Sequence, residues 1–192
     1  MSDQPIIDVG GRKQLFIDER FIDRKHGVRL TVNPPHKAEM VLTPEMPWEA
    51  GAAALYADII EHDGVCKLWY DAFVGLNVSE ALPRSLCYAT SADGLHWRRE
   101  NVNLFDWMGR RENNIVMPGG GGVMLDPAAD DEHRFKCLGV AHENAVWPES
   151  QGVKWDCTGG ALHLFTSPDG IRWKRHHPLA SPFFHDSHNQ LL

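Results

Sequence analysis

Hydrophobic and polar positions along the chain follow the pattern of short β-strands rather than that of helices. Apolar, aromatic and β-branched residues gather in short runs that are bounded by Gly, Pro, Asp and Ser. The clearest runs are Lys67–Phe73, Leu86–Thr90 and Ala161–Thr166. Apolar residues that recur every three or four positions, the sign of an amphipathic helix, are nearly absent. The pattern predicts an all-β domain.

One sequence pattern occurs twice and indicates an internal repeat. Residues 90–98 and 166–174 both read Thr-Ser-x-Asp-Gly-x-x-Trp followed by a basic residue, 76 positions apart. Upstream, Val65–Tyr70 aligns with Arg134–Gly139 at a spacing of 69. We attribute the difference between the two spacings to a longer loop in the second copy, where Gly and Pro are frequent.

The repeated pattern has the composition of a tight turn between two strands. Ser91 and Asp93 are expected to hydrogen-bond to nearby backbone N–H groups, and Gly94 to supply a positive φ. Trp97 then opens the outer strand with a large apolar surface that can pack against a neighbouring unit. Each copy therefore predicts four antiparallel strands.

Four-stranded units that repeat along a chain are typical of a β-propeller. We expect N-terminal strands or a closure segment over residues 1–46, a first blade over 47–110 and a second over 111–180. A third blade starts within 181–192, with its inner strand beginning at Asn189. Two blades would leave open sheet edges, so we expect an N-terminal fragment of a longer protein. A small β-sandwich is the alternative.

Composition narrows the expected partners. The 192 residues hold 19 Lys and Arg against 26 Asp and Glu, a formal net charge of −7, so nucleic acid is not expected. The chain shows neither a secretory signal nor an apolar run long enough to span a bilayer, so we expect a cytoplasmic protein with no membrane partner. Three of the four cysteines lie in apolar runs, which predicts buried free thiols. The sequence gives no indication of the oligomeric state.

Several segments resemble five-bladed β-propeller glycoside hydrolases of the family 32 and 43 type. They are Gln14–Asp23, Pro47–Glu49, Leu68–Tyr70, the two Ser-x-Asp-Gly-x-x-Trp turns and His185–Asn189. The resemblance implies a partial five-bladed propeller whose central pocket binds a poly- or oligosaccharide. It also implies carboxylates on the inner strands of successive blades, one protonated and one ionised, which flank the glycosidic bond.

The residues just before the expected inner strands are the candidates for this site. We predict Glu49, from the first blade, and Asp186, from the third, as the catalytic carboxylates. The family has Asp in the first blade and Glu in the third. The predicted substrate-binding residues, which supply aromatic, carboxylate, amide and imidazole groups, are Trp48, Glu112, Asn113, His188 and Asn189. Asp58 is expected to face the axis or a blade interface, and Asp71 to end a strand.

Other motifs favour structural roles. Neither the histidine spacing nor any other feature predicts a metal site, and no cofactor is expected, although the resemblance leaves room for a calcium-like ion on the propeller axis. Gly119–Gly122 lacks the Lys-Ser/Thr and the helix of a phosphate loop, so we ascribe it to crowding of the inner strands. Asp126 and Pro127 are read as a turn.

Three functions fit these observations. The first is a glycoside hydrolase, an enzyme once any further blades are present. The second is a non-catalytic propeller that binds carbohydrate or protein through the same face. The third is an inactive partial domain.

Overall fold

The computed structural model of the chain describes residues 7–11, 13–37, 39–74, 84–141, 161–176, 180–184 and 188–191. The chain divides into two compact units, Met1–Glu39 and Met40–Leu192. The described residues of the first unit form turns and bends with no strand, and the closure segment expected as the alternative over residues 1–46 stays a prediction. Within the described residues no helix is long and apolar enough to cross a membrane.

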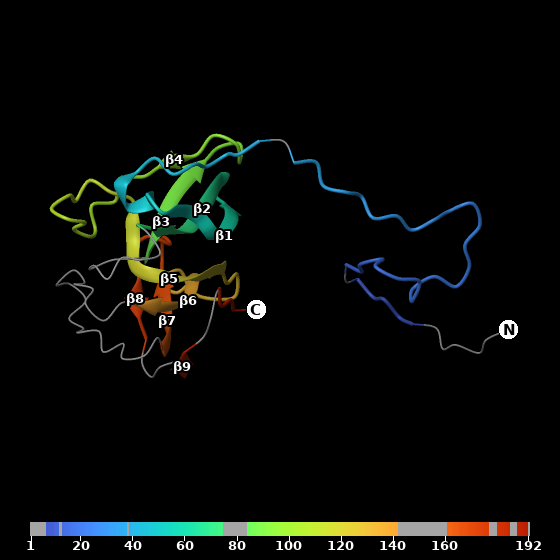
Figure 1. Cartoon of the computed structure of the whole chain (residues 1–192). Helices are drawn as coiled ribbons and strands as arrows, with labels where there is room; N and C mark the ends of the chain where they lie inside the picture. The colour runs from blue at the N-terminus through green and yellow to red at the C-terminus, as the bar shows by residue number, and fades with distance from the viewer. Residues whose placement is uncertain are drawn as a thin grey trace. The chain divides into compact units, whose positions relative to one another are not determined.

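The second unit is built from antiparallel strands, as Figure 1 shows, which confirms the all-β prediction. One short 3₁₀ helix, η1 (Pro47–Glu49), precedes the strands. The strands are β1 (Ala52–His62), β2 (Val65–Phe73), β3 (Arg84–Ser91), β4 (Arg98–Arg99), β5 (Ile115–Leu125), β6 (Phe135–Ala141), β7 (Ala161–Ser167), β8 (Lys174–Arg175) and β9 (Ser181–Phe184).

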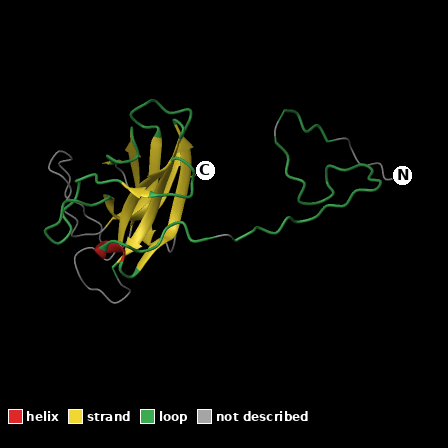
Figure 2. Ribbon diagram, turned by 90° about the horizontal axis from the view of Figure 1, so that it is seen from above, coloured by secondary structure: helices red, strands yellow, loops and turns green. Residues whose placement is uncertain are grey.

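The strand β5 joins two groups of strands. Its first residues pair with β3 in the group β1–β2–β3–β4, and Gly119 to Leu125 pair with β6 in the group β5–β6–β7–β8. We call these groups the first and the second sheet. Figure 2 shows the strands of both sheets lying close together, with η1 in red near one end of them. Arrangement of the sheets as blades of a propeller stays a prediction.

The two repeated turns have the hydrogen bonds expected from the sequence. Ser91 Oγ accepts from the backbone N–H of Gly94 at 2.9 Å, and Ser167 Oγ accepts from that of Gly170 at 2.9 Å. Asp93 Oδ1 accepts from two backbone N–H groups further along the turn, and its counterpart Asp169 does the same. Both glycines take positive φ, +74° and +76°. The turn prediction is confirmed.

Aromatic side chains fill the space between the two sheets. Trp69 of β2 is fully buried, with its ring centroid 5.5 Å from that of Phe135 of β6. Its indole N–H donates to the carbonyl of Gly170 at 2.6 Å, so the first sheet is tied to the repeated turn of the second. Trp97 is only half-buried and donates to Gly94 within its own turn. Trp69 therefore supplies the contact between the first and the second sheet that the sequence analysis expected of Trp97.

The third inner strand was predicted at Asn189, but the last strand among the described residues is β9, at Ser181–Phe184. It pairs with the first half of β7, as the start of β5 pairs with the first half of β3. Residues 188–191 are not in a strand. The side chain of Gln190 donates to Asp58 of β1, and the backbone of Asn189 lies close to Gly122 of β5. No strand ladder pairs these described residues with a neighbouring strand.

Candidate functional site

Side-chain alternation along β2 separates two groups of polar residues. Neighbouring residues of a strand point to opposite faces of its sheet. Trp69 contacts β6, so Trp69 and Asp71 face the second sheet. Tyr70 faces away from it and donates from its hydroxyl to Glu49 of η1 at 2.5 Å. The predicted site residues fall on both faces.

Glu49 lies at the centre of a buried network on the face turned away from the second sheet. The guanidinium of Arg99 on β4 donates to both Glu49 oxygens, at 2.8 and 2.9 Å. The backbone N–H groups of Glu45 and Met46 donate to Oε2 at 2.9 and 3.2 Å. Burial by itself would raise the pKa of Glu49, but these hydrogen bonds and that from Tyr70 outweigh it and hold the pKa below its usual value.

The other predicted residues near η1 are also held by the framework. Trp48 is buried, and its indole N–H donates to Asn114 Oδ1 at 2.9 Å. Asn113 is buried and bonds to backbone groups through both its amide nitrogen and its amide oxygen. Glu112 is exposed. A substrate-binding role for the three residues stays a prediction, and the bonds of Trp48 and Asn113 give each a structural reason to be present.

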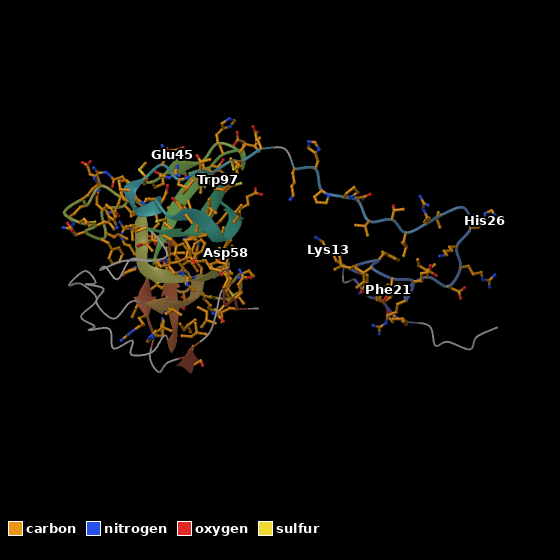
Figure 3. The ribbon with its side chains drawn as sticks, in the orientation of Figure 1. Lys13, Phe21, His26, Glu45, Asp58 and Trp97 are labelled. Carbon is orange, nitrogen blue, oxygen red and sulfur yellow. The ribbon has the colours of Figure 1, made fainter. Side chains whose placement is uncertain are left out.

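A second group of polar residues lies on the other face, between β1 and β5. Asp58 of β1 is buried and accepts a hydrogen bond from the backbone N–H of Val123 on β5 at 2.7 Å. The imidazole Nε2 of His188 lies 3.2 Å from Asp58 Oδ2, and Gln190 donates from its side chain to Asp58 Oδ1. Asp58, labelled in Figure 3, thus joins three segments that are far apart in the sequence.

Three planar side chains stack beside Asp58. The ring of Tyr56 lies parallel to that of His188, with centroids 5.6 Å apart and planes at 15°. The guanidinium of Arg84 lies 5.6 Å from the centre of the Tyr56 ring and 5.7 Å from that of Phe73. Both distances are within the range of cation–π attraction, so Arg84 is held by contact with two aromatic rings.

Asp71 lies behind this stack, inside β2 rather than at its end, and its side chain is 1% exposed. Its Oδ2 accepts from Arg84 Nε at 2.9 Å and also from Nη2. Its Oδ1 is buried and has no hydrogen-bond partner among the described residues. Burial raises the pKa of Asp71 to about 6, although the Arg84 guanidinium works in the opposite direction.

The raised pKa of Asp71 predicts a pH-dependent stability. Since the folded state holds this proton more tightly than the unfolded chain, Asp71 makes the fold less stable as the pH rises from about 4 to about 6. A shift from 3.8 to about 6 corresponds to about 3 kcal/mol. Urea unfolding of the wild type and of Asp71→Asn across this range measures the contribution. The difference in unfolding free energy between them should change with pH, and a constant difference would contradict the assignment.

Glycines make room for this group of residues. A Cβ on Gly120 would collide with the guanidinium of Arg84, and one on Gly122 with the backbone of Asn189. A Cβ on Gly121 would lie 2.7 Å from Cys137 Sγ. These close approaches confirm that the glycine run reflects crowding. Asp126, also read from the sequence as a turn residue, accepts the backbone N–H of Ala128 in a turn and pairs with Lys136.

We call Tyr56, Asp58, Asp71, Arg84, His188 and Gln190 the inner-strand cluster. Of the predicted site residues, His188 belongs to it and Asn189 lies beside it, whereas Asp186 lies outside the described residues. Sequence reasoning missed Tyr56, Arg84 and Gln190. One available signal was Asp71, a charged residue within an apolar run and on the same face as Trp69. Among the described residues, no three His, Cys, Asp or Glu side chains come together as metal ligands.

The fold defines the chain as an antiparallel all-β protein. No protein-family model matches the sequence, and no curated protein matches it either. The chain is similar to solved structures of glycoside hydrolases. One represents the GH130 family of mannoside phosphorylases, which contains glycoside hydrolases that target β-1,2 mannosidic linkages in Candida mannan. The identity is 20%, the TM-score is 0.45, and the match covers 75% of this chain and 40% of that one.

Two further similar structures come from Bacteroides ovatus. A glycosyl hydrolase is 19% identical with a TM-score of 0.39, over 68% of this chain and 32% of that one. A glycoside hydrolase from strain ATCC 8483 is 16% identical with a TM-score of 0.41, over 76% of this chain and 41% of that one. The chain therefore spans less than half the length of each of these structures.

Proposed function

We propose that the chain is part of a carbohydrate-acting protein of the glycoside hydrolase type, and that a poly- or oligosaccharide binds at the inner-strand cluster. The observation that carries this proposal is the meeting of Asp58, His188 and Gln190 from two distant segments, beside the pair of Arg84 and Asp71. Sugar hydroxyls both donate and accept hydrogen bonds. Carboxylates, an amide, an imidazole and a guanidinium beside an aromatic ring are suited to bind them.

Cleavage of the bound sugar is the second part of the proposal. Glycoside hydrolysis requires one carboxyl group that protonates the leaving oxygen and a second that is ionised. Asp186 keeps its proposed catalytic role, and it lies two positions before His188 in the sequence. The catalytic role predicted for Glu49 remains untested. Glu49 lies on the face turned away from the inner-strand cluster, and both its oxygens accept hydrogen bonds there, so we do not include Glu49 in the proposed sugar site.

The proposed site is tested by two substitutions in the cluster. His188→Ala and Asp58→Asn should each weaken binding to a carbohydrate at least about tenfold, because each removes a polar partner or the charge that orients it. A glycan array identifies the ligand, and titration calorimetry measures the dissociation constants. His188→Ala changes no strand residue, so it still tests the site if Asp58→Asn fails to fold.

The matched control is Asp126→Asn, which removes a carboxylate that also accepts a backbone N–H but lies in a turn of the second sheet. It should bind carbohydrate like the wild type. A wild-type chain that binds none of the sugars on the array, or cluster variants that bind as well as the control, would contradict the proposal.

A further inference from the structure

Two buried carboxylates of this fold differ in how their oxygens are paired. Both oxygens of Glu49 accept hydrogen bonds from several donors. Asp71 has one paired oxygen, Oδ2, whereas its buried Oδ1 has no partner in the described part of the chain. A buried polar atom without a partner lowers stability and calls for a reason beyond packing. Asp71 therefore has the features of a functional group, and Glu49 those of a structural one.

The partner of Asp71 is fixed in an unusual position. Arg84 is about one-fifth exposed and contacts the rings of Tyr56 and Phe73. Its Nε and Nη2 point to Asp71, and Gly120 leaves the space that the guanidinium occupies. A guanidinium has five N–H donors, so one held by its Nε edge retains donors for another acceptor. Arg84 is thus the exposed member of the pair and Asp71 the buried one.

The groups whose charges act on Asp71 come from each neighbouring element. Arg84 and His188 favour its ionised form, and Asp58 opposes it. The thiols of Cys87 and Cys137 are also close enough to interact with the Asp71 charge, but burial raises their pKa values far above neutrality, so they stay uncharged. Among these groups, Asp71 is the carboxyl whose pKa burial raises to about 6.

We propose that Asp71 is a positioning residue of the carbohydrate site: its ionised carboxylate holds Arg84 against Tyr56 and Phe73, where the free donors of the guanidinium bind sugar hydroxyl oxygens. The inference rests on the proposed function and adds a means of regulation to it. Protonation of Asp71 removes the charge that anchors Arg84, and the long side chain is then free to leave the aromatic faces. Carbohydrate affinity accordingly rises as Asp71 ionises.

The first test measures carbohydrate affinity against pH. The wild type should bind about tenfold more tightly at pH 8 than at pH 5, with a midpoint near pH 6, because a charge-assisted hydrogen bond is lost on protonation. Asp71→Asn should bind weakly at both values, with no transition. Arg84→Lys, which keeps the charge but loses the planar fork, should also bind weakly at pH 8. Asp126→Asn, which disrupts the Asp126–Lys136 pair, is the matched control and should behave like the wild type.

A second measurement needs no ligand and separates this inference from the proposed function. In NMR titrations, the side-chain ¹⁵Nε signal of Arg84 should shift with the same midpoint as the carboxyl carbon of Asp71, and the Arg84 shift should disappear in Asp71→Asn. Absence of that coupled shift would overturn the positioning role, whether or not a sugar binds. Wild-type affinity of Asp71→Asn at pH 8 would overturn it as well. A pH transition that persists in Asp71→Asn would overturn the assignment of the switch to Asp71.

Discussion

Replacement of Glu49 by Gln is expected to lower the free energy of unfolding by about 3 kcal/mol or more. The substitution leaves the Arg99 guanidinium, whose side chain is 9% exposed, without its buried counter-charge. The substitution also replaces one carboxylate oxygen by an NH₂ group. Each oxygen accepts from Arg99, and in addition Oε1 accepts from Tyr70 and Oε2 from backbone N–H groups, so the new NH₂ donor would face other donors. Urea unfolding monitored by tryptophan fluorescence measures the change.

Glu45→Gln is the matched control for this prediction. Glu45 pairs with the same arginine at 3.1 Å, but its side chain is 60% exposed, so its loss should lower the stability by less than about 1 kcal/mol. A Glu49→Gln variant as stable as the wild type would contradict the structural role. If that stable variant no longer released reducing sugar from a polysaccharide, the result would support the prediction that Glu49 is catalytic.

The second large effect is expected at Gly170, where Ala should destabilise the protein by about 2–4 kcal/mol. Its φ of +76° is unfavourable for any residue with a Cβ, which accounts for about 1 kcal/mol. The new methyl group would in addition collide with the buried ring of Trp69, which cannot move without disturbing Phe135 and Tyr88. Forced overpacking of this kind adds about 1–3 kcal/mol.

Gly94→Ala provides an internal control because it changes the equivalent glycine of the first turn. Its φ of +74° is almost the same, but no atom lies within 4 Å of the position of its Cβ. We expect a loss of only about 1 kcal/mol there. Denaturant midpoints at equal slopes compare the two variants. Equal losses would show that the backbone angle alone matters and that Trp69 does not join the sheets through this turn.

Both repeated turns could be predicted from sequence because their hydrogen bonds are local. Ser91, Asp93 and Gly94 lie within four positions of each other, and so do their counterparts in the second copy. The strands were predicted for a similar reason, since short apolar runs and the turn residues that bound them are local features. The inner-strand cluster could not be predicted in the same way. Its Asp58 and Gln190 are 132 positions apart, and local pattern does not determine such a contact.

For this protein, the sequence alone determined the all-β class, the two similar turns and the alternation that places Tyr70 and Asp71 on opposite faces of β2. Only the tertiary structure decided what covers each face. One face of β2 packs on η1, where Glu49 accepts a hydrogen bond from Tyr70. The other face meets β5, where the Oδ1 atom of Asp71 has no hydrogen-bond partner among the described residues. Whether a carboxylate is structural or functional depends on its burial and its partners. The burial and the partners of a carboxylate follow from the packing of distant segments, and the residue type alone does not reveal that packing.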